Sequence, residues 1–276
     1  MKTRDEKIAL IKHKAKLMRR DSLDMALVAG SNGAHLGPGY SMMEIMATLY
    51  FEVMRHDPKN PFWDERDRFI LSKGHGVLGY YTALAESGYF PTDVLKTFET
   101  TDSFLAGHPS MDMAHGIEVT SGSLGHGLPI AEGIALAGKK NGKGYTVYAY
   151  LGDGECNEGS IWESAMSCAH FALDNIVAIL DRNKLQSDGI CRDILCMGDM
   201  AEKWRVFGWQ VTEIDGHDVG QILDALHVRN RAIGRPNMII ANTIKGKGVS
   251  FFENDNSWHH KKLTLELYDA AMAELA

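Results

Sequence analysis

One stretch of the sequence, residues 145–189, restricts the possible folds more than any other. The apolar run at 145–151 predicts a buried strand, and this strand stops at a Gly-Asp-Gly turn. Apolar residues at three- and four-residue intervals across 158–173 predict a helix, and the apolar run at 176–180 predicts a second strand. A strand, a helix and a strand of these lengths form a right-handed unit with parallel strands. The stretch therefore predicts an α/β fold.

Polar residues at the carboxyl ends of these two strands suit a metal-bound diphosphate. Gly152, Asp153 and Gly154 follow the first strand, and Asn183 follows the second. Parallel strands bring such ends to one edge of a sheet, where open α/β sheets bind ligands. Mg²⁺ on a diphosphate prefers a carboxylate and neutral oxygen donors, which Asp153, the Asn183 amide and a backbone carbonyl near Leu185 can supply. The start of the helix after the turn offers unpaired N–H groups to the diphosphate. A lone Gly-Asp-Gly is usually only a turn, but an Asn placed one helix and one strand further on favours a functional site.

These residues resemble the thiamine diphosphate motif, and their surroundings resemble transketolases over about residues 8–263. The resemblance implies metal ligation by Asp153, Asn183 and the main-chain carbonyl of Leu185. It places Glu158 near a subunit interface, together with Glu163, where acidic residues link paired active sites. The cofactor-binding positions that it implies are His75, Gly122, Ser123, Leu124, Gly152, Asp153, Gly154, Glu158, Asn183 and His259.

Three further loops each place a His within a stretch rich in glycine or proline. His35 lies inside the segment 29–39, which is too rich in glycine and proline to predict a helix or strand. His75 follows a predicted strand, and His108 lies in Gly-His-Pro. A single His of this kind is more often solvent-exposed and idle, but three at sheet edges indicate a site. By resemblance His35 faces the reactive carbon of the cofactor, His75 reaches its diphosphate and His108 contacts the sugar.

The last part of the chain adds one more imidazole. Ser-Trp-His-His at 257–260 resembles the family's Trp-His-Gly, with His259 in the matching position and His260 in place of the usual Gly. His260 is given no role by this resemblance. Lys245 follows the last predicted strand and could approach phosphate, but its setting favours an exposed lysine on a turn. The catalytic positions implied by the resemblance are His35, His108, His259 and Glu158.

The remaining apolar periodicity completes a three-layer α/β/α domain with a mostly parallel sheet, spanning residues 1–276 with a helical N-terminal segment at about 5–57. The predicted strands are 68–72, 145–151, 176–180, 209–214 and 237–243, and the predicted helices are 5–27, 41–54, 77–87, 130–140, 158–173, 200–207 and 219–233.

Composition excludes several classes of protein. The net charge of −7 argues against a non-specific nucleic-acid binder. No run approaches the ~18 apolar residues of a membrane helix, and the basic first residues lack the apolar core of a signal peptide. Four cysteines without metal spacing indicate reduced thiols, so a cytoplasmic protein is expected.

The resemblance implies a thiamine diphosphate enzyme that uses Mg²⁺, or Ca²⁺ or Mn²⁺, to transfer a two-carbon ketol unit from a ketose phosphate to an aldose phosphate. The common pentose phosphates and a specialised ketose phosphate are both open as substrates. It implies that this chain is the N-terminal subunit of a split transketolase. The activating Glu would then come from a C-terminal partner, in an α2β2 heterotetramer in which the partner covers faces near Glu158 and Ala165. Two alternatives stay open. One is another thiamine enzyme, a 2-oxo acid dehydrogenase E1 component or a deoxyxylulose phosphate synthase, and the other is a non-catalytic subunit.

Overall fold

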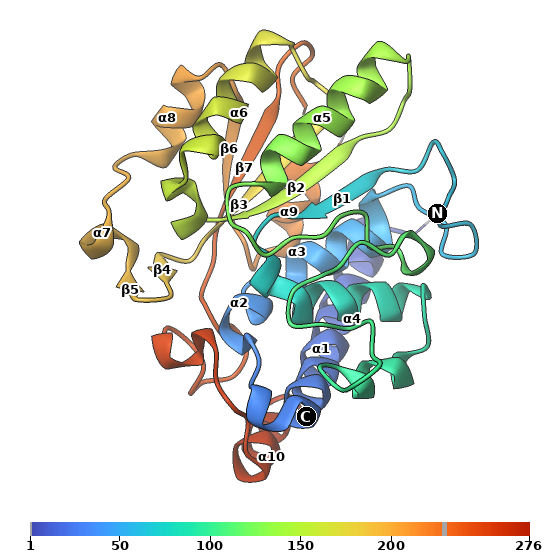
Figure 1. Ribbon diagram of the computed structural model, residues 1–276, viewed down its shortest axis with the longest axis vertical. Helices are drawn as coiled ribbons and strands as arrows, with labels where there is room; N and C mark the ends of the chain where they lie inside the picture. The colour runs from blue at the N-terminus through green and yellow to red at the C-terminus, as the bar shows by residue number, and fades with distance from the viewer. Residues whose placement is uncertain (1, 228–230) are drawn as a thin grey trace.

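A parallel sheet runs through the middle of the computed structural model, which describes residues 2–227 and 231–276 (Figure 1). Within these residues the sheet has five strands in the order β1-β2-β3-β7-β6, and every neighbouring pair is parallel. The predicted strands are confirmed, with small shifts at their ends. The strands are β1 (Arg68–Leu71), β2 (Val147–Gly152), β3 (Ile176–Arg182), β6 (Gln210–Asp215) and β7 (Asn237–Asn242).

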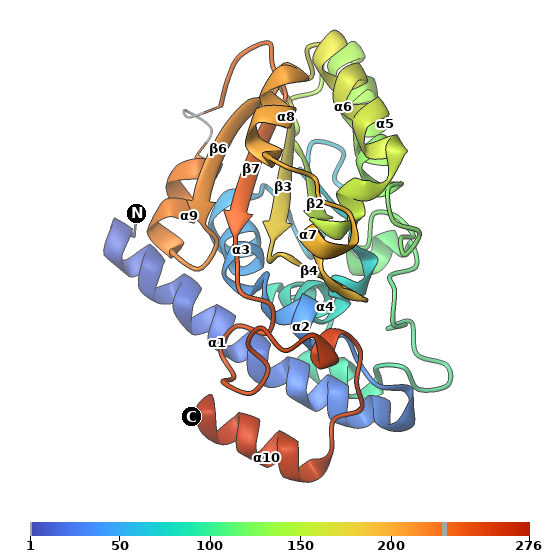
Figure 2. The same ribbon diagram turned by 90° about the vertical axis from the view of Figure 1, so that its left-hand side faces the viewer.

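Both faces of the sheet are buried, because alternate side chains of each strand point to opposite faces. In β2, Tyr148 and Tyr150 belong to one hydrophobic core, and Val147, Ala149 and Leu151 belong to the other. Figure 2 shows α5, α6 and α8 on one side of the sheet and α1, α3 and α9 on the other. The predicted three-layer α/β/α class is therefore confirmed. The helices are α1 (Arg4–Ala29), α3 (Met43–Thr48), α4 (Val77–Ser87), α5 (Gly127–Lys140), α6 (Gly159–His170), α8 (Met200–Val206) and α9 (Val219–Leu226).

The order of the strands places a crevice at the carboxyl edge of the sheet. The chain passes from β2 to β3 and from β3 to β6 on the side of α6 and α8, and it returns from β6 to β7 through α9 on the opposite side. The direction of winding therefore changes between β3 and β7, which is the place where open α/β sheets bind ligands. The segments around this edge are η3 (Gly74–Gly76), η6 (Gly154–Asn157), β4 (Leu185–Gln186), β5 (Gly189–Ile190), α7 (Cys191–Ile194) and η8 (Asn256–His259).

One prediction about local structure is wrong, because α2 (Leu36–Tyr40) is a short helix inside the segment predicted to be irregular. Its glycines allow close packing rather than a loose chain. A Cβ at Gly39 would lie 2.9 Å from the Cβ of Leu78, and a Cβ at Gly37 would lie 2.9 Å from the Trp258 carbonyl oxygen. The surrounding core thus outweighs the low helix propensity of this sequence.

The long α1 helix is capped at its first turn and packs against a helix from the end of the chain. Its first turn has a capping box, in which the Thr3 side chain accepts from the Glu6 N–H and the Glu6 side chain accepts from the Thr3 N–H. The helix α10 (Leu265–Glu274), which the sequence pattern did not predict, lies beside α1 (Figure 2). The predicted helix at 219–233 ends earlier, at Leu226, and part of its remainder lies outside the described residues.

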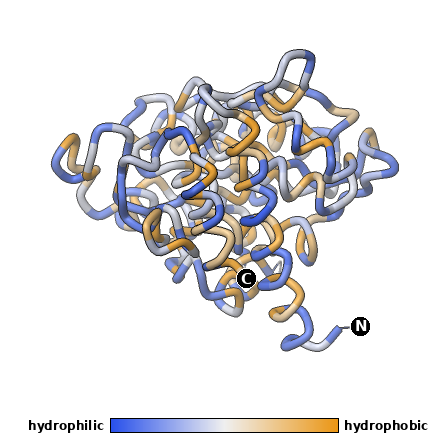
Figure 3. Tube along the Cα trace, turned by 90° about the horizontal axis from the view of Figure 1, so that it is seen from below, coloured by the Kyte–Doolittle hydropathy of each residue, from blue (hydrophilic) through white to orange (hydrophobic). Residues whose placement is uncertain are grey.

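Hydrophobic stretches of the trace are short and interrupted by hydrophilic ones (Figure 3). Among the residues that the structure describes, no helix combines the length and the apolar character needed to span a bilayer.

Candidate active site

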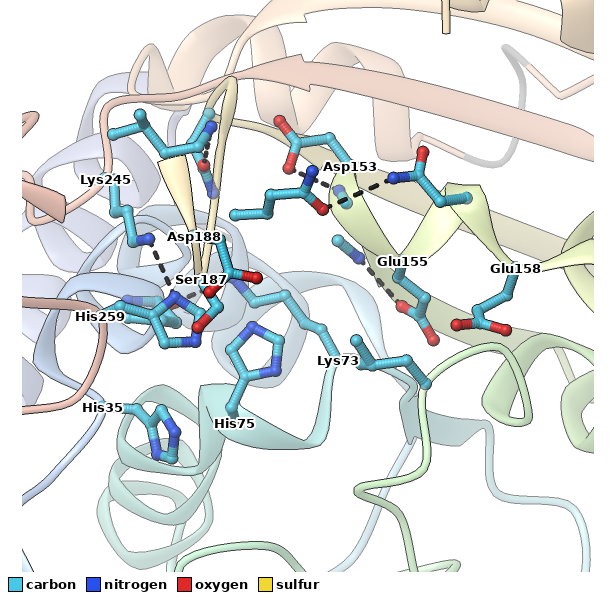
Figure 4. A pocket seen from close by; sticks show the side chains of 18 of the residues that line it. His35, Lys73, His75, Asp153, Glu155, Glu158, Ser187, Asp188, Lys245 and His259 are labelled. Atoms are coloured by element: carbon cyan, nitrogen blue, oxygen red, sulfur yellow. Dashed lines mark hydrogen bonds between the residues drawn. The ribbon is translucent and has the colours of Figure 1, made fainter. Parts of the chain in front are cut away.

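A cavity of about 420 Å³ opens at the carboxyl edge of β1, β2, β3 and β7 (Figure 4). It collects residues that are more than 200 positions apart in the sequence. Of the predicted site residues only Ser123 lies outside it, with an exposed side chain. The predicted residues that line the cavity are His35, His75, His108, Gly122, Leu124, Gly152, Asp153, Gly154, Glu158, Asn183, Leu185 and His259.

The predicted metal ligands lie at the ends of two paired strands. The carboxylate of Asp153 is buried and accepts hydrogen bonds from the N–H groups of Gly154, at 2.8 Å, and Lys184. The Asn183 side-chain oxygen accepts from the Leu185 N–H at 3.0 Å. Lys184 has a φ of 68°, so the chain turns sharply between Asn183 and Leu185. Burial, and then the negative charge of Asp181, raise the pKa of Asp153 to about 6. A divalent cation beside this carboxylate would reverse that effect.

The chemistry of this edge fits a diphosphate held by a hard cation. One carboxylate, one amide oxygen and one main-chain carbonyl match the oxygen donors that Mg²⁺ prefers, alongside water and phosphate oxygens. In the described part of the chain no cluster of three or more His, Cys, Asp or Glu side chains offers an alternative metal centre. Two buried polar atoms of the cavity wall, the Asn157 side-chain oxygen and Gln186 Nε2, have no hydrogen-bond partner among the described residues. A polar ligand would satisfy them.

Two glycines lie where other side chains closely approach the backbone of the cavity wall. Gly122 has a φ of 141°, and a Cβ there would meet the His108 ring at 3.2 Å. A Cβ at Gly154 would lie 2.7 Å from Gln186. A larger residue at either position would displace the His108 or Gln186 side chain, both of which line the cavity.

Four imidazoles gather on the side of the cavity opposite Asp153. The ring centroid of His35 lies 5.7 Å from that of His75, 5.5 Å from His108 and 5.6 Å from His259. The rings of His75 and His259 are 5.2 Å apart. Figure 4 shows His35, His75 and His259 on one wall, facing the edge that carries Asp153 and Glu155.

These imidazoles are held in the neutral form. Burial, followed by the charges of neighbouring His residues and Lys245, lowers the pKa of His35 to about 3. Burial and the charge of Lys245 lower the pKa of His259 to about 4. Burial also lowers the pKa values of His75 and His108. Neutral imidazole rings can donate one hydrogen bond and accept another, which suits hydroxyl-bearing ligands.

Three charged residues of the site were missed by sequence reasoning. Glu155 is buried, and its carboxylate accepts from the Ser72 hydroxyl, from the Gly125 N–H at 2.9 Å and from the Gly152 N–H at 3.0 Å. It thereby joins the end of β1, the loop before α5 and the end of β2. Its place inside the Gly-Asp-Gly-Glu run was the one signal that could have identified it.

Lys73 forms a buried ion pair with Asp181 below the cavity. Its ammonium also donates to the Pro38 carbonyl at 2.9 Å and to Ser41 Oγ at 3.3 Å. Burial raises the pKa of Asp181, but the Lys73 charge and hydrogen bonds outweigh this, so that the pKa is lowered overall. A single sequence gives no sign of such a pair, because its two members lie far apart along the chain.

The prediction that Lys245 is exposed is wrong. Its side chain is 1% exposed and lines the cavity, with Nζ 2.7 Å from Asn256 Oδ1 and 2.9 Å from His259 Nδ1. Burial, and then the positive charge of Lys73, lower the pKa of Lys245 to about 8. Its position after the buried β7 strand, beside the cavity, was the missed signal.

Comparison with known proteins decides the family. Residues 12–272 match the family model described as "Transketolase, thiamine diphosphate binding domain". The chain belongs to the transketolase family. The predicted family, the predicted thiamine diphosphate-binding domain and the predicted transketolase-type chain are thereby confirmed.

Two similar relatives are named as subunits of larger enzymes. The chain is 45% identical to a subunit of the apulose-4-phosphate transketolase of Actinobacillus succinogenes, over 96% of this chain and 95% of that protein. It is 44% identical to "6-deoxy-6-sulfo-D-fructose transketolase subunit SqwG" of a Clostridium species, over 96% of each chain. The solved transketolase from Leishmania mexicana is similar with a TM-score of 0.88 and 30% identity, over 96% of this chain and 41% of that one. The chain thus spans less than half the length of this solved transketolase.

Proposed function

We propose that this chain is the N-terminal, thiamine diphosphate-binding subunit of a two-chain transketolase. With its partner it transfers a two-carbon ketol unit from a ketose phosphate to an aldose phosphate. The observation that carries the proposal is the convergence of Asp153 and Asn183 with the imidazoles of His35, His108 and His259 around one cavity. The imidazoles favour a substrate rich in hydroxyl groups over a 2-oxo acid, and the buried carboxylate favours a catalytic over a non-catalytic subunit.

The proposal gives each cofactor-binding residue a role. Asp153, Asn183 and the Leu185 carbonyl would hold Mg²⁺, and the N–H groups after Gly152 and Gly154 would be available to the diphosphate. His75, on the wall opposite Asp153, would also bind the diphosphate. The main chain of Gly122, Ser123 and Leu124 and the His259 ring would contact the rest of the cofactor. Residues 1–276 form one domain for this purpose.

The remaining side chains act on the sugar. When bound, thiamine diphosphate supplies the nucleophilic carbon and the electron sink for cleavage of the carbon–carbon bond. His35, His108 and His259 hydrogen-bond the sugar hydroxyls, and each neutral ring can accept a proton from the sugar at its unprotonated nitrogen and return to the neutral form by giving that proton back. Lys245 Nζ, 2.9 Å from His259 Nδ1, orients that ring. Glu158, exposed at the rim, extends toward the partner.

The quaternary structure and location belong to the same proposal. The relatives named as transketolase subunits are covered over 95% and 96% of their length, so a separate C-terminal chain would supply the activating Glu. We propose an α2β2 heterotetramer, because thiamine enzymes of this family build their sites between subunits. All four cysteines are free thiols and two of them are buried, which suits a reducing cytoplasm.

The test is an assay of the chain together with the C-terminal partner encoded beside it, with Mg²⁺ and thiamine diphosphate. The donors are xylulose 5-phosphate, 6-deoxy-6-sulfofructose, apulose 4-phosphate and pyruvate, each with an aldose phosphate acceptor. Transfer of a ketol unit from at least one of the sugars, and none from pyruvate, is expected. Turnover of pyruvate alone would overturn the proposal in favour of a 2-oxo acid enzyme. Cofactor binding without turnover of any donor would favour a non-catalytic subunit.

A further inference from the structure

A fifth imidazole lies on the outer side of the histidine cluster. The ring centroid of His260 is 4.4 Å from that of His35, with an interplanar angle of 58°. This is the shortest ring distance that His35 makes within the described residues, since its contacts with His75, His108 and His259 measure 5.5–5.7 Å. His260 is itself exposed and does not line the cavity. His260 is thus an exposed ring in contact with the partly buried ring of His35.

The backbone holds His260 in this place. The N–H of Ala34 donates to the Lys261 carbonyl at 3.0 Å, and the N–H of Lys261 donates to the Ala34 carbonyl at 3.1 Å. This bridge pairs Ala34, which precedes His35, with Lys261, which follows His260. His35 and His260 are therefore held next to each other. A Cβ at Gly33, where φ is 73°, would lie 3.1 Å from His260 Cε1. A glycine at that position leaves room for the ring.

Packing alone orients the ring of His35. Within the described residues neither ring nitrogen of His35 takes part in a hydrogen bond, whereas His259 has Lys245 and His115 has Asp112. An imidazole that works at a reacting centre is normally fixed by a partner on its second nitrogen. At His35 the contact with the His260 ring takes the place of such a partner.

We infer that His260 is a positioning residue for His35: its ring covers the solvent side of the His35 imidazole and keeps that ring directed into the cavity. The inference rests on the proposed function, because it concerns an imidazole assigned to the substrate. It assigns no contact with substrate to His260 itself.

The electrostatic surroundings agree with this geometry. Burial is the largest cause of the lowered pKa of His35, and the charge of His260 is the next. Exclusion of water by the covering ring is therefore expected to be the larger effect, and the charge of His260 the smaller one. The other charged or titratable groups that face His35 are the imidazoles of His75, His108 and His259 and the ammonium of Lys245, while Glu99 faces His108 from the preceding loop.

Two substitutions distinguish the effect of the His260 ring as a cover for His35 from the effect of its charge. His260→Gly removes both the ring and its charge, and His260→Phe keeps a ring of similar shape without a charge. His115→Phe is the matched control, because His115 is an imidazole stacked on Phe104, at a ring distance of 4.1 Å, away from the cavity. Full chains labelled with ¹⁵N-histidine report the protonation state and tautomer of each ring by long-range ¹H–¹⁵N spectra between about pH 5 and pH 8, the range in which free imidazole titrates. His35→Gln assigns the signals.

In the parent chain the His35 ring should stay neutral and in one tautomer over this range. In His260→Gly it should take up a proton toward pH 5 and show two tautomers, whereas His260→Phe and His115→Phe should match the parent. In the assembled enzyme kcat/KM of His260→Gly should fall about tenfold more steeply than the parent between pH 7.5 and 5.5, with His260→Phe within about twofold. If His260→Gly does not fold, His260→Ala takes its place.

Two results would overturn the inference: an unchanged His35 spectrum in His260→Gly, or equal changes in His260→Gly and His260→Phe. The spectra need no turnover. An enzyme without ketol transfer but with the expected spectra would therefore remove the proposed function and leave the positioning role of His260.

Discussion

At the scale of single residues, Asp153 is the group on which metal binding depends, because it is the one carboxylate in the proposed ligand set. Asp153→Asn should weaken Mg²⁺-dependent binding of thiamine diphosphate by about 100-fold, since even the loss of a hydrogen bond to a metal ligand commonly costs about 10–100-fold in affinity. Calorimetry on the assembled enzyme measures this, and chelation of the metal should abolish binding in the parent. Asp193→Asn on exposed α7 is the control and should bind normally. Equal affinities of parent and Asp153→Asn would place the metal elsewhere.

The buried pair of Lys73 and Asp181 gives a prediction for stability. Lys73→Met would leave the Asp181 carboxylate buried with only neutral partners, the hydroxyls of Ser41 and Thr243 and the Asn183 amide, and we expect a loss of about 3–5 kcal/mol. Without Lys73 the pKa of Asp181 rises, so the loss should be larger at pH 8 than at pH 5. The double substitution Lys73→Met, Asp181→Asn should recover part of the stability in urea unfolding. A double variant as unstable as the single one would show that the charge is not the cause.

Asp21 in α1 gives a second prediction for stability, in which the substitution should stabilise the fold instead of destabilising it. Burial, and then the negative charge of Glu86, raise its pKa to about 7, and its Oδ2 has no hydrogen-bond partner in the described structure. The unfolded carboxyl loses its proton near pH 4 and the folded one near pH 7, so Asp21 destabilises the fold increasingly from pH 4 to pH 7.

Asp21→Asn should therefore stabilise the chain by about 1–2 kcal/mol at pH 8, after allowance for partial exposure, and by little at pH 4. Thermal unfolding at both pH values measures the difference, with the exposed Asp93→Asn as control. A gain of the same size at pH 4 would contradict the assigned pKa.

Residue types with a fixed chemical use were visible in the sequence, and buried charges were not. His35, His75, His108 and His259 stand beside glycines or in a matching motif, and the structure brings all four to one cavity. Lys245 reads as a surface lysine, because nothing local shows that β7 delivers it into the interior. The same holds for Lys73 and Glu155, whose roles depend on partners contributed by other strands.

At the scale of secondary structure, elements set by periodicity were predicted well and those set by packing were not. The α4 helix has the predicted bounds, 77–87, and each predicted strand has its counterpart in the sheet. The short α2 helix is stabilised by close approach of other segments, which a single sequence does not display. The β4–β5 pair is a local hairpin that turns at residues 187–188, and its strands of two residues each are too short to produce a periodic pattern.

Two glycines in α5 should respond in opposite ways to replacement by alanine. Alanine at an open helix position raises stability by about 0.5–1 kcal/mol, and a methyl group added at Gly133 would have no described atom within 4 Å. At Gly138 the same methyl group would lie 2.6 Å from the buried Tyr145 ring. Gly133→Ala should therefore stabilise the chain, and Gly138→Ala should destabilise it by about 1–3 kcal/mol. Urea unfolding of the pair tests this, and a gain for both would mean that α5 can move away from the sheet.

At the scale of the whole molecule, several apolar side chains on α6 and on either side of α7 are exposed. Met166 on α6 is 53% exposed, and Ile190 and Leu195 flanking α7 are 48% and 53% exposed. Ala165 itself is fully buried against the sheet, so a partner that covers the face near it would contact exposed neighbours on α6 such as Met166. Glu158 is exposed and lines the cavity rim, so it remains the predicted contact. Exposed apolar side chains favour a subunit interface on the elements that carry them.

The last prediction is that the chain transfers no ketol unit by itself. Its described residues account for the metal, the diphosphate and one side of the sugar, and by family resemblance the Glu that activates the cofactor belongs to the other half of the enzyme. Obligate interfaces commonly bury more than ~2,000 Å². The chain alone should therefore also self-associate through exposed apolar side chains such as Met166. Purified alone it should show no ketol transfer and a concentration-dependent mass in light scattering. With its partner it should show turnover and a fixed mass of two copies of each chain. Met166→Glu should impair assembly, whereas Val206→Glu, on the outer side of α8, should not. Turnover by the chain alone would contradict the two-chain enzyme.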